Sequence, residues 1–315
     1  MKAKLVLSLS WVLLTACSHG RESQLAQCLG FEQSDRVLIV NIDDVGMHPD
    51  YDKAAFELID HNKAQTMSLM VPAPNFTLSA KIAAARNLPV GLHLTLTNEW
   101  QEKQPWGGVL PPSKVPSLYN PQGLLWATTQ EVLEHADIKE IEQELRAQID
   151  TALQAGLNIT HIDAHMLVLM QNAELVNLFY NLANDYQLAA VYQGFWFNPS
   201  KQKSITSELQ QVGAVVPDVY YMQYNPDERR ADPDIAEKKY RHMVETLQYG
   251  INHLAIHPSY NTPSAAEAME DMVLRESDFA IWRADKIHQL IKQEDIKTSN
   301  LAGMRALKRE NIDCL

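Results

Sequence analysis

Two adjacent carboxylates, Asp43 and Asp44, end a mostly apolar run that begins at Val37. This run, V-L-I-V-N-I-D-D, is rich in β-branched residues, which is typical of a strand buried on both faces of a parallel sheet. Two buried acids are unfavourable unless they are hydrogen-bonded, paired or bound to a metal ion. The carboxyl end of such a strand is where α/β proteins build their sites. A simpler interpretation is a turn in which one aspartate caps the next helix.

Histidines and a third aspartate occupy similar positions further along the chain. His93 lies in G-L-H-L, His257 follows an apolar run in A-I-H-P-S, and T-H-I-D-A-H contains His161, Asp163 and His165. Residues two apart in a strand project to the same side, so the last three share one face. A lone histidine on a strand is more often structural than functional, but four strand ends that carry Asp or His favour one shared site.

Metal-assisted hydrolysis accounts for these residue types. One carboxylate and two imidazoles can bind Zn²⁺ or a similar ion and leave a position open for water. Water bound in this way has a pKa of about 7, so hydroxide is available at neutral pH. A second carboxylate can accept the proton of that water, and a histidine across the site can protonate a leaving amine. The residues therefore predict a site that hydrolyses an amide or an ester.

Strand and helix patterns alternate along the chain, as expected for an α/β fold. Beyond the first strand, apolar runs predict strands at 65–71, 90–96, 159–165, 188–192, 219–223, 252–256 and 297–301. The segments between most of these runs have helical periodicity. This alternation predicts a mostly parallel sheet, and the number of repeats favours a distorted (β/α) barrel. No linker interrupts residues 36–315, which are predicted to form one domain.

The stretch 98–126 interrupts the alternation and is rich in proline, glycine and aromatic residues. So long an irregular stretch is usually functional or disordered, and its aromatic content argues against disorder. One interpretation is a loop over the site, in which Trp100, Trp106 and Trp126 stack on sugar rings. The alternative is that these rings fix the loop to the domain.

Residues 1–16 have the features of a secretory signal. Two lysines precede an apolar run that is too short for a typical membrane-spanning helix. The segment L-T-A-C resembles a bacterial lipobox, which implies cleavage before Cys17 and a lipid that anchors this cysteine in the cell envelope. Ser18 implies the outer membrane, and residues 17–35 are predicted to be a polar tether. The alternative is an ordinary signal peptide with an incidental cysteine.

Charge and cysteine content narrow the partners and the compartment. The formal net charge of −12 argues against a nucleic-acid-binding face. Cys28 and Cys314 lie near opposite ends of the mature chain and could form a disulfide in an oxidising compartment. Two unpaired thiols are the alternative.

Four motifs resemble the YdjC family of carbohydrate deacetylases, which includes chitooligosaccharide and hopanoid-linked deacetylases. They are I-D-D-V-G, V-G-L-H-L-T-L, the phrase E-L-R-A-Q-I followed by G-L-N-I-T-H-I-D-A-H, and A-I-H-P-S-Y. They extend over nearly the whole mature chain. The resemblance implies a distorted (β/α) barrel that uses one divalent ion, zinc or magnesium, to remove acetyl groups from N-acetylated sugars or oligosaccharides.

The resemblance also implies a role for each residue of the set. It implies that Asp44, His93 and His165 are the metal ligands and that His161 and Asp163 support these ligands. Asp43 would be the general base, and His257 would be the general acid.

Departures from the family pattern leave two other interpretations open. The family commonly has Ser at position 164, where this chain has Ala164. The family also has further histidines after position 165, where this chain has Met-Leu-Val. His48 and Ser259 replace a usual Ser and Gly, which implies altered substrate contacts. The chain could therefore be a carbohydrate-binding lipoprotein on a decayed enzyme fold. A metal-independent glycoside hydrolase that uses Asp43 and Asp163 is the second alternative.

Overall fold

Parallel strands form one curled sheet in the computed structural model, which describes residues 23–310. The order across the sheet is β5-β4-β3-β2-β1-β7-β6, and β8 pairs with β1 near its start. Every strand pairing is parallel, and among the described residues none joins β5 to β6. The prediction of a distorted barrel with a mostly parallel sheet is therefore confirmed. The strands are β1 (Arg36–Val45), β2 (Thr66–Leu69), β3 (Pro89–Leu94), β4 (Asn158–Ala164), β5 (Ala189–Ala190), β6 (Val219–Met222), β7 (Gly250–Ile256) and β8 (Lys297–Thr298).

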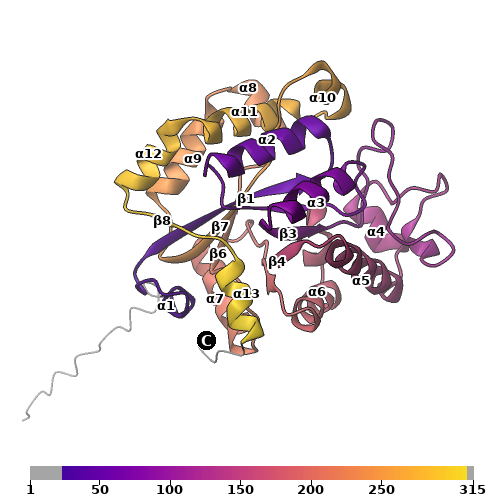
Figure 1. Cartoon of the computed structure of the whole chain (residues 1–315), viewed down its shortest axis with the longest axis horizontal. Helices are drawn as coiled ribbons and strands as arrows, with labels where there is room; N and C mark the ends of the chain where they lie inside the picture. Colours follow the sequence, from indigo (N-terminus) through magenta and orange to yellow (C-terminus); the bar gives the residue numbers. More distant parts are fainter. Residues whose placement is uncertain (1–22, 311–315) are drawn as a thin grey trace, which may run out of the picture.

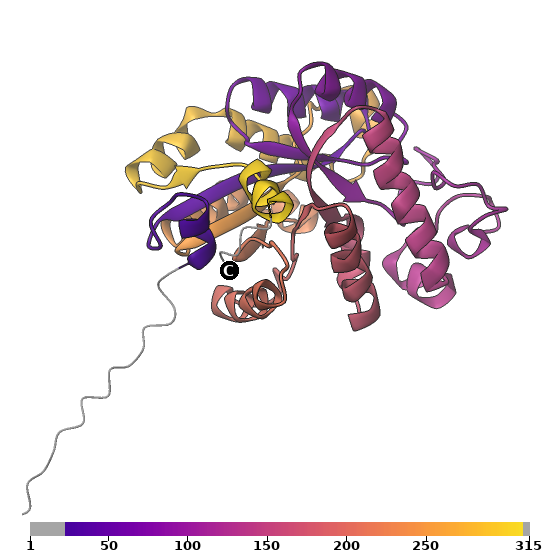
Figure 2. The same ribbon diagram turned by 60° about the horizontal axis from the view of Figure 1, so that its bottom comes forward.

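Helices pack around the outside of the curled sheet (Figures 1 and 2). They connect successive strands, as right-handed parallel crossovers require. Their bounds are α1 (Gln24–Cys28), α2 (Pro49–Asp60), α3 (Phe76–Ala85), α4 (Thr129–His135), α5 (Ile138–Gln154), α6 (Ala173–Asp185), α7 (Pro199–Gln211), α8 (Pro226–Ala231), α9 (Ile235–Glu245), α10 (Pro263–Ala268), α11 (Met272–Arg283), α12 (Asp285–Gln293) and α13 (Ala302–Arg309). Two short 3₁₀ segments, η1 (Pro116–Leu118) and η2 (His165–Met170), complete the elements.

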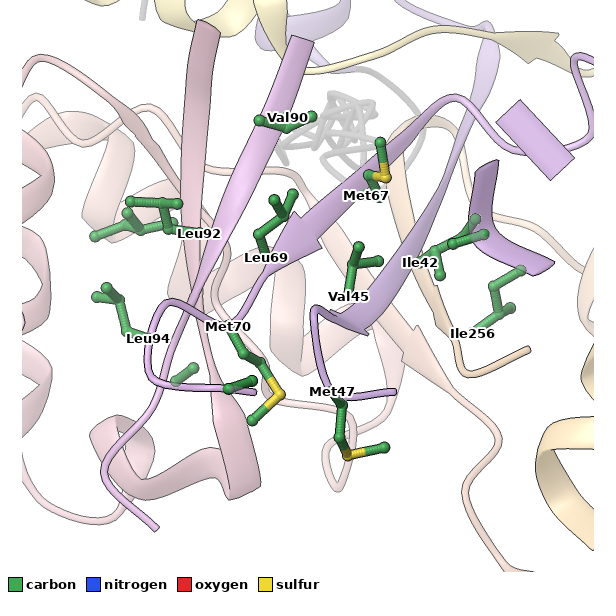
Figure 3. Packing of buried hydrophobic residues seen from close by; sticks show 14 of the residues in the cluster. Ile42, Val45, Met47, Met67, Leu69, Met70, Val90, Leu92, Leu94 and Ile256 are labelled. Atoms are coloured by element: carbon green, nitrogen blue, oxygen red, sulfur yellow. The ribbon is translucent and has the colours of Figure 1, made fainter. Parts of the chain in front are cut away.

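Alternation along the strands separates an apolar outer face from a mixed inner face. On β1, Leu38, Val40 and Ile42 belong to the main core between the sheet and the helices, part of which Figure 3 shows. The residues that alternate with them, Val37 and Ile39, belong to a second apolar cluster inside the barrel. Toward the carboxyl end of β1, the inward-facing positions hold polar residues instead. The barrel interior is thus apolar at one end and polar at the other, where the predicted site residues lie.

Helix α1 covers the apolar end of the barrel, next to α13 (Figure 1). Leu25 and Ala26 are fully buried in the same cluster as Ile39. The Ser23 hydroxyl accepts a hydrogen bond from the Ala26 amide at 3.0 Å and donates one to Asp218 at 2.7 Å. This part of the predicted tether therefore packs as part of the folded domain, because its apolar face covers side chains that the sheet leaves exposed.

The helix predictions differ from the structure mainly in the second half of the chain. The segment between the predicted strands at 188–192 and 219–223 contains α7, and the segment between those at 252–256 and 297–301 divides into α10, α11 and α12. Ala284 has an extended backbone between α11 and α12, which ends the first of these helices. At the start of α2, the side chain of His48 accepts from the Asp50 amide, so that His48 caps this helix.

The N-terminal predictions fall largely outside the described residues. The signal segment, Cys17 and Cys314 all lie there. Cys28 is disulfide-bonded, and its predicted pairing with Cys314 stays a prediction. Within residues 23–310, no helix combines the length and the apolar character that a membrane span requires.

Candidate active site

Both carboxylates of the Asp43–Asp44 pair line one cavity, although adjacent residues in a strand normally face opposite sides. Asp43 continues the inward row of β1. Asp44 has a φ of 60°, in the left-handed region, and the pairing of β1 with β2 shifts register between Ile42 and Val45. This backbone conformation is unfavourable by about 1–3 kcal/mol for a residue other than glycine and is concentrated at functional sites. Here it turns the second carboxylate into the site.

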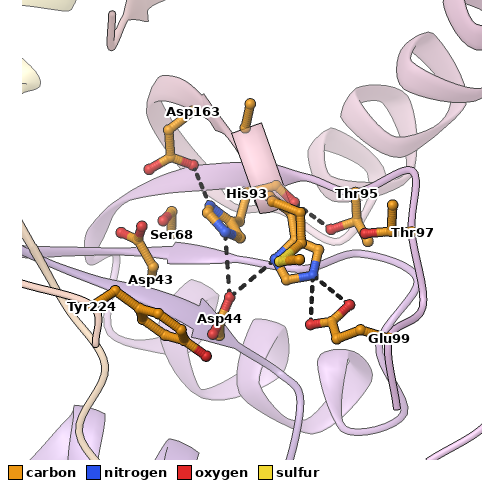
Figure 4. A network of polar contacts seen from close by, with 12 residues as sticks. Asp43, Asp44, Ser68, His93, Thr95, Thr97, Glu99, Asp163 and Tyr224 are labelled. Carbon is orange, nitrogen blue, oxygen red and sulfur yellow. Dashed lines mark hydrogen bonds and ion pairs between the residues drawn. The ribbon is translucent and has the colours of Figure 1, made fainter. Parts of the chain in front are cut away.

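The three predicted metal ligands, Asp44, His93 and His165, converge on one point. Asp44 Oδ1 lies 3.3 Å from His93 Nε2 and 3.3 Å from His165 Nδ1, and the three ligand atoms all lie within 4.8 Å of one another. Each of these residues is no more than 3 % exposed. Figure 4 shows Asp44 and His93 at this point, with Glu99 on the far side. The structure therefore brings together residues from β1, β3 and the end of β4.

Hydrogen bonds determine which histidine nitrogens face this point. His93 Nδ1 donates to Asp163 Oδ1 at 2.8 Å, which leaves the Nε2 lone pair facing Asp44. His165 Nε2 donates to both oxygens of Glu99 at 3.0 Å, and its buried Nδ1 has no hydrogen-bond partner. Two lone pairs and a carboxylate oxygen therefore face one another. Such a set is stabilised only by a cation between them or by protonation.

The spacing of these atoms suits a tetrahedral metal ion. With ligand bonds of about 2.0–2.1 Å, tetrahedral geometry separates two ligand atoms by about 3.3 Å. The two Asp44–histidine distances have this value. The donor set of one carboxylate and two imidazoles also leaves a fourth position open. Asp44, His93 and His165 thus fit a divalent cation.

Asp43 lies beside this point, in a network of buried polar groups. Its Oδ1 accepts a hydrogen bond from Asn41 Nδ2 at 2.6 Å, and Asn41 also reaches Ser68 at 3.0 Å and Asp163 at 3.3 Å. Burial, together with the charge of Asp163, raises the pKa of the Asp43 carboxyl. A carboxyl with a raised pKa is a suitable proton acceptor near neutral pH.

A buried arginine that the sequence analysis did not select neutralises part of the charge on Asp44. Arg275 Nη2 lies 3.1 Å from Asp44 Oδ2, and Arg275 Nε donates to Asp271 at 2.8 Å. Although burial raises it, the pKa of Asp44 lies well below its usual value because His165, His93 and Arg275 favour the charged form. Asp44 is therefore ionised, as a metal ligand must be.

His257 lines the same cavity, directly after the end of β7. Its backbone amide donates to Asp278 Oδ2 at 2.8 Å, and its ring packs edge-on against Tyr224 at 5.0 Å between centroids. Burial lowers the pKa of His257 to about 4, against an opposing effect of Asp44. The ring is thus neutral at neutral pH and available to accept a proton.

The cavity has a volume of about 270 Å³ and a rim that is largely apolar. Met166 and Leu167, both with φ in the left-handed region, contribute to its lining, together with Phe195, Met222 and Tyr224. A small cavity with an apolar rim and polar groups at its base is typical of a site for one small ligand or one sugar ring.

The three tryptophans predicted to contact sugar are not among the residues that line this cavity. Trp106 is 5 % exposed and its Nε1 donates to the Thr97 carbonyl at 3.0 Å, while Trp126 Nε1 donates to the Ser117 carbonyl at 2.8 Å. Trp100 packs against the main core. These contacts match the alternative interpretation, in which the rings fix the loop to the domain.

The remaining predicted residues lie beneath the cavity. Asp163 is fully buried and positions His93, as expected for a residue that supports a ligand. His161 is also fully buried, two residues before Asp163 in β4. It makes no hydrogen bond to Asp44, His93 or His165. Glu99, by contrast, contacts His165 directly, and only its position six residues after His93 could have drawn attention to it.

Fold and site together define an α/β half-barrel with a buried Asp-His-His cluster that can hold a metal ion at the carboxyl end of its strands. The chain belongs to the YdjC-like protein family, whose model matches residues 37–293.

Similar proteins come from several bacteria. A carbohydrate deacetylase of Thermoanaerobacter pseudethanolicus is 24% identical over 272 residues, which is 86% of this chain and 100% of that protein. Another, from Enterococcus faecalis, is 31% identical over 158 residues, or 49% of this chain and 58% of that protein. The crystal structure of a proposed cellobiose-phosphate cleavage protein from Enterococcus faecalis has a TM-score of 0.69 and 24% identity, and the match covers 85% of this chain and 98% of that one. This likeness supports the fold.

Proposed function

We propose that this protein is a metal-dependent deacetylase that removes acetyl groups from N-acetylated sugars or oligosaccharides. The observation that carries the proposal is the convergence of Asp44 Oδ1, His93 Nε2 and His165 Nδ1 beside a further carboxylate, Asp43. The carbohydrate deacetylases among its relatives support the substrate class. We favour zinc because the ligand set and the spacing suit a tetrahedral site, and magnesium is the alternative.

Each residue of the site has a task in this proposal. A bound divalent ion would polarise a water molecule and stabilise the oxyanion of the tetrahedral intermediate. Asp43 takes the proton of the attacking water, because its pKa is raised and it lines the cavity. Asp163 and Glu99 hold the two ligand imidazoles in the tautomers that present a lone pair.

His257 protonates the leaving amine from the opposite side of the cavity. Its ring is neutral at neutral pH, so it first takes a proton from solvent, to which Asp43 later returns the proton that it accepted from water. Negative charge that develops on the substrate next to the ring raises its pKa and makes this transfer favourable. Asp278 holds the backbone of His257 in place, and is itself held by Arg229 at 2.7 Å.

The alternatives are less consistent with the geometry. A glycoside hydrolase with Asp43 and Asp163 requires both carboxyls to flank a glycosidic bond. Asp163 is fully buried, bonded to His93, and absent from the residues that line the cavity. A decayed site would have lost a ligand, whereas all three converge here.

Acetate release tests the proposal. Purified protein should release acetate from chitooligosaccharides or related acetylated glycans, lose this activity after chelation, and regain it when Zn²⁺ or Mg²⁺ is returned. His93→Ala should lose both metal and activity, whereas Asp60→Asn, which changes an exposed acid at the end of α2, should retain both. Activity that persists in metal-free protein would refute the proposal.

We also propose that Cys17 is lipidated and anchors the protein in the bacterial cell envelope, on the outer membrane. Cys17→Ser should shift the protein from the membrane fraction to the soluble fraction of the producing cell. An unchanged membrane fraction would contradict lipid anchoring at this residue.

A further inference from the structure

Beneath the candidate active site, three buried side chains inside the barrel form a second cluster. His161 and Asp163 come from β4 and His253 comes from β7. All three have no exposed surface, and one ligand atom from each lies within 4.8 Å of the others. The two imidazole rings are 6.1 Å apart and inclined by 71°. The function proposed above gives His253 no role.

The hydrogen bonds of Thr160 establish which nitrogen of His161 carries the proton. Thr160 Oγ1 donates its only proton to the Val90 carbonyl, at 3.0 Å. The same oxygen lies 2.9 Å from His161 Nδ1, so this contact requires Nδ1 to donate. His161 Nε2 therefore carries a lone pair, and this buried atom has no hydrogen-bond partner.

Two acceptors face each other as a result. The His161 Nε2 lone pair lies 3.9 Å from Asp163 Oδ2, which is too far for a hydrogen bond, and Asp163 Oδ2 itself accepts only the 3.3 Å hydrogen bond from Asn41. Both ring nitrogens of His253 are also buried without a partner. Buried polar groups in native proteins are nearly always satisfied, so these unpartnered nitrogens indicate a bound guest between the side chains.

The charge of the surrounding groups favours a cation as this guest. Asp43, Asp44, Asp163 and Asp271 are buried around the two clusters, and Glu99 joins them at the cavity. Only Arg275 brings a permanent positive charge among these groups. Even with one divalent ion at the Asp44 cluster, these carboxylates outnumber the compensating positive charges, and a second cation would reduce the excess.

A glycine on the neighbouring strand accommodates the His161 ring. In β3, Gly91 lies beside His161 in register. A Cβ at position 91 would lie 2.3 Å from His161 Nε2, in collision with the ring. Glycine at this position allows the imidazole to project into the barrel.

We propose that His161, Asp163 and His253 bind a second divalent cation inside the barrel. Asp163 would then link the two sites, since its Oδ1 holds His93 and its Oδ2 faces the second ion. The 3.9 Å between His161 Nε2 and Asp163 Oδ2 must shorten by about 0.6 Å to reach the spacing of about 3.3 Å that tetrahedral coordination requires. This proposal does not depend on the deacetylase activity, because it concerns groups that no substrate can reach.

Metal content tests the second site. Protein produced in medium with added Zn²⁺ and dialysed against metal-free buffer should contain two equivalents of zinc per chain. His253→Gln should reduce this to one, and the pair Asp44→Asn with His165→Gln should independently reduce it to one. His288→Gln, which changes a half-buried histidine on α12, should leave both equivalents in place.

The outcomes separate the two proposals. One equivalent in the wild type that His253→Gln does not change would overturn the second site and leave the first intact. A second outcome is that His253→Gln loses metal and the double variant Asp44→Asn with His165→Gln does not. This outcome would support the second site and refute metal binding at the Asp44 cluster. If His253→Gln does not fold, anomalous diffraction at the zinc edge from wild-type crystals decides: a peak between His161 and His253 is expected, and a water molecule there would overturn the proposal.

Discussion

Glu99 places both carboxylate oxygens 3.0 Å from Nε2 of His165, on the side of the ring away from Asp44. This contact ties the long loop after β3 to the candidate metal site. Although burial lowers it, the pKa of His165 is raised to about 9 by Glu99 and Asp44 in the metal-free protein. The carboxylate therefore governs both the tautomer and the basicity of the ligand.

Replacement of Glu99 should weaken metal binding. Glu99→Gln removes the charge that favours the Nε2–H tautomer, and loss of such a partner typically reduces metal affinity by about 10- to 100-fold. Competition with a chelator of known affinity measures the effect. Glu102→Gln changes an exposed acid of the same loop and should leave affinity unaltered. Equal affinities in the two variants would exclude a positioning role for Glu99.

Asp43→Asn should separate metal binding from turnover. The variant can still accept the hydrogen bond from Asn41 through its amide oxygen, but it cannot accept a proton from water. The rate of acetate release should fall by about 10²- to 10⁴-fold, the usual contribution of a general base. Metal content should stay at the wild-type level, and near-normal turnover would show that another group removes the proton.

Phe195 should affect substrate binding, unlike the tryptophans of the loop. It lines the cavity and is 40 % exposed. Phe195→Ala should raise KM about two- to tenfold, because one aromatic contact contributes about 0.5–1.5 kcal/mol beyond its buried area. Trp126→Ala should instead lower Tm and leave KM unchanged, since Trp126 bonds Ser117 and stacks on His135. The reverse pattern would restore the prediction that Trp126 binds sugar.

Leu25→Ala should destabilise the protein even though it lies in the predicted tether. Leu25 is fully buried at the apolar end of the barrel, so its truncation should lower the free energy of unfolding by about 2–5 kcal/mol. Leu78→Ala, on the exposed face of α3, should change it by less than about 0.5 kcal/mol. Denaturant unfolding of both variants provides the comparison, and equal stabilities would mean that α1 does not support the barrel.

His257 should make the stability of the metal-free protein depend on pH. Burial lowers its pKa to about 4 in the folded chain, against about 6.5 in the unfolded chain. As the pH falls below about 6.5, the unfolded chain binds more protons than the folded one, so stability decreases down to about pH 4.

His257→Gln removes this dependence. The difference in unfolding free energy between wild type and variant should change by up to about 1.4 kcal/mol per pH unit in that window. Urea unfolding at several pH values measures this change, and His61→Gln at the surface serves as the control. If the difference in unfolding free energy does not change with pH, His257 is charged in the native state over this pH range.

The sequence by itself determined the fold class and most of the candidate site. Strand and helix periodicity depends on local alternation of apolar residues, which is why the sheet could be predicted strand by strand. The carboxyl ends of parallel strands share one edge, and this rule alone brought Asp44, His93 and His165 together.

Only the tertiary structure decided how these groups are oriented and held. The left-handed backbone at Asp44, the contact between Glu99 and His165, and the salt bridge from Arg275, 231 residues away, have no signature in local spacing. The packing of α1 against the barrel and the contacts of the loop tryptophans likewise have no signature in local spacing. Whether an apolar side chain covers the core or faces a ligand depends on what the rest of the chain packs against it, and that is set by contacts between distant segments.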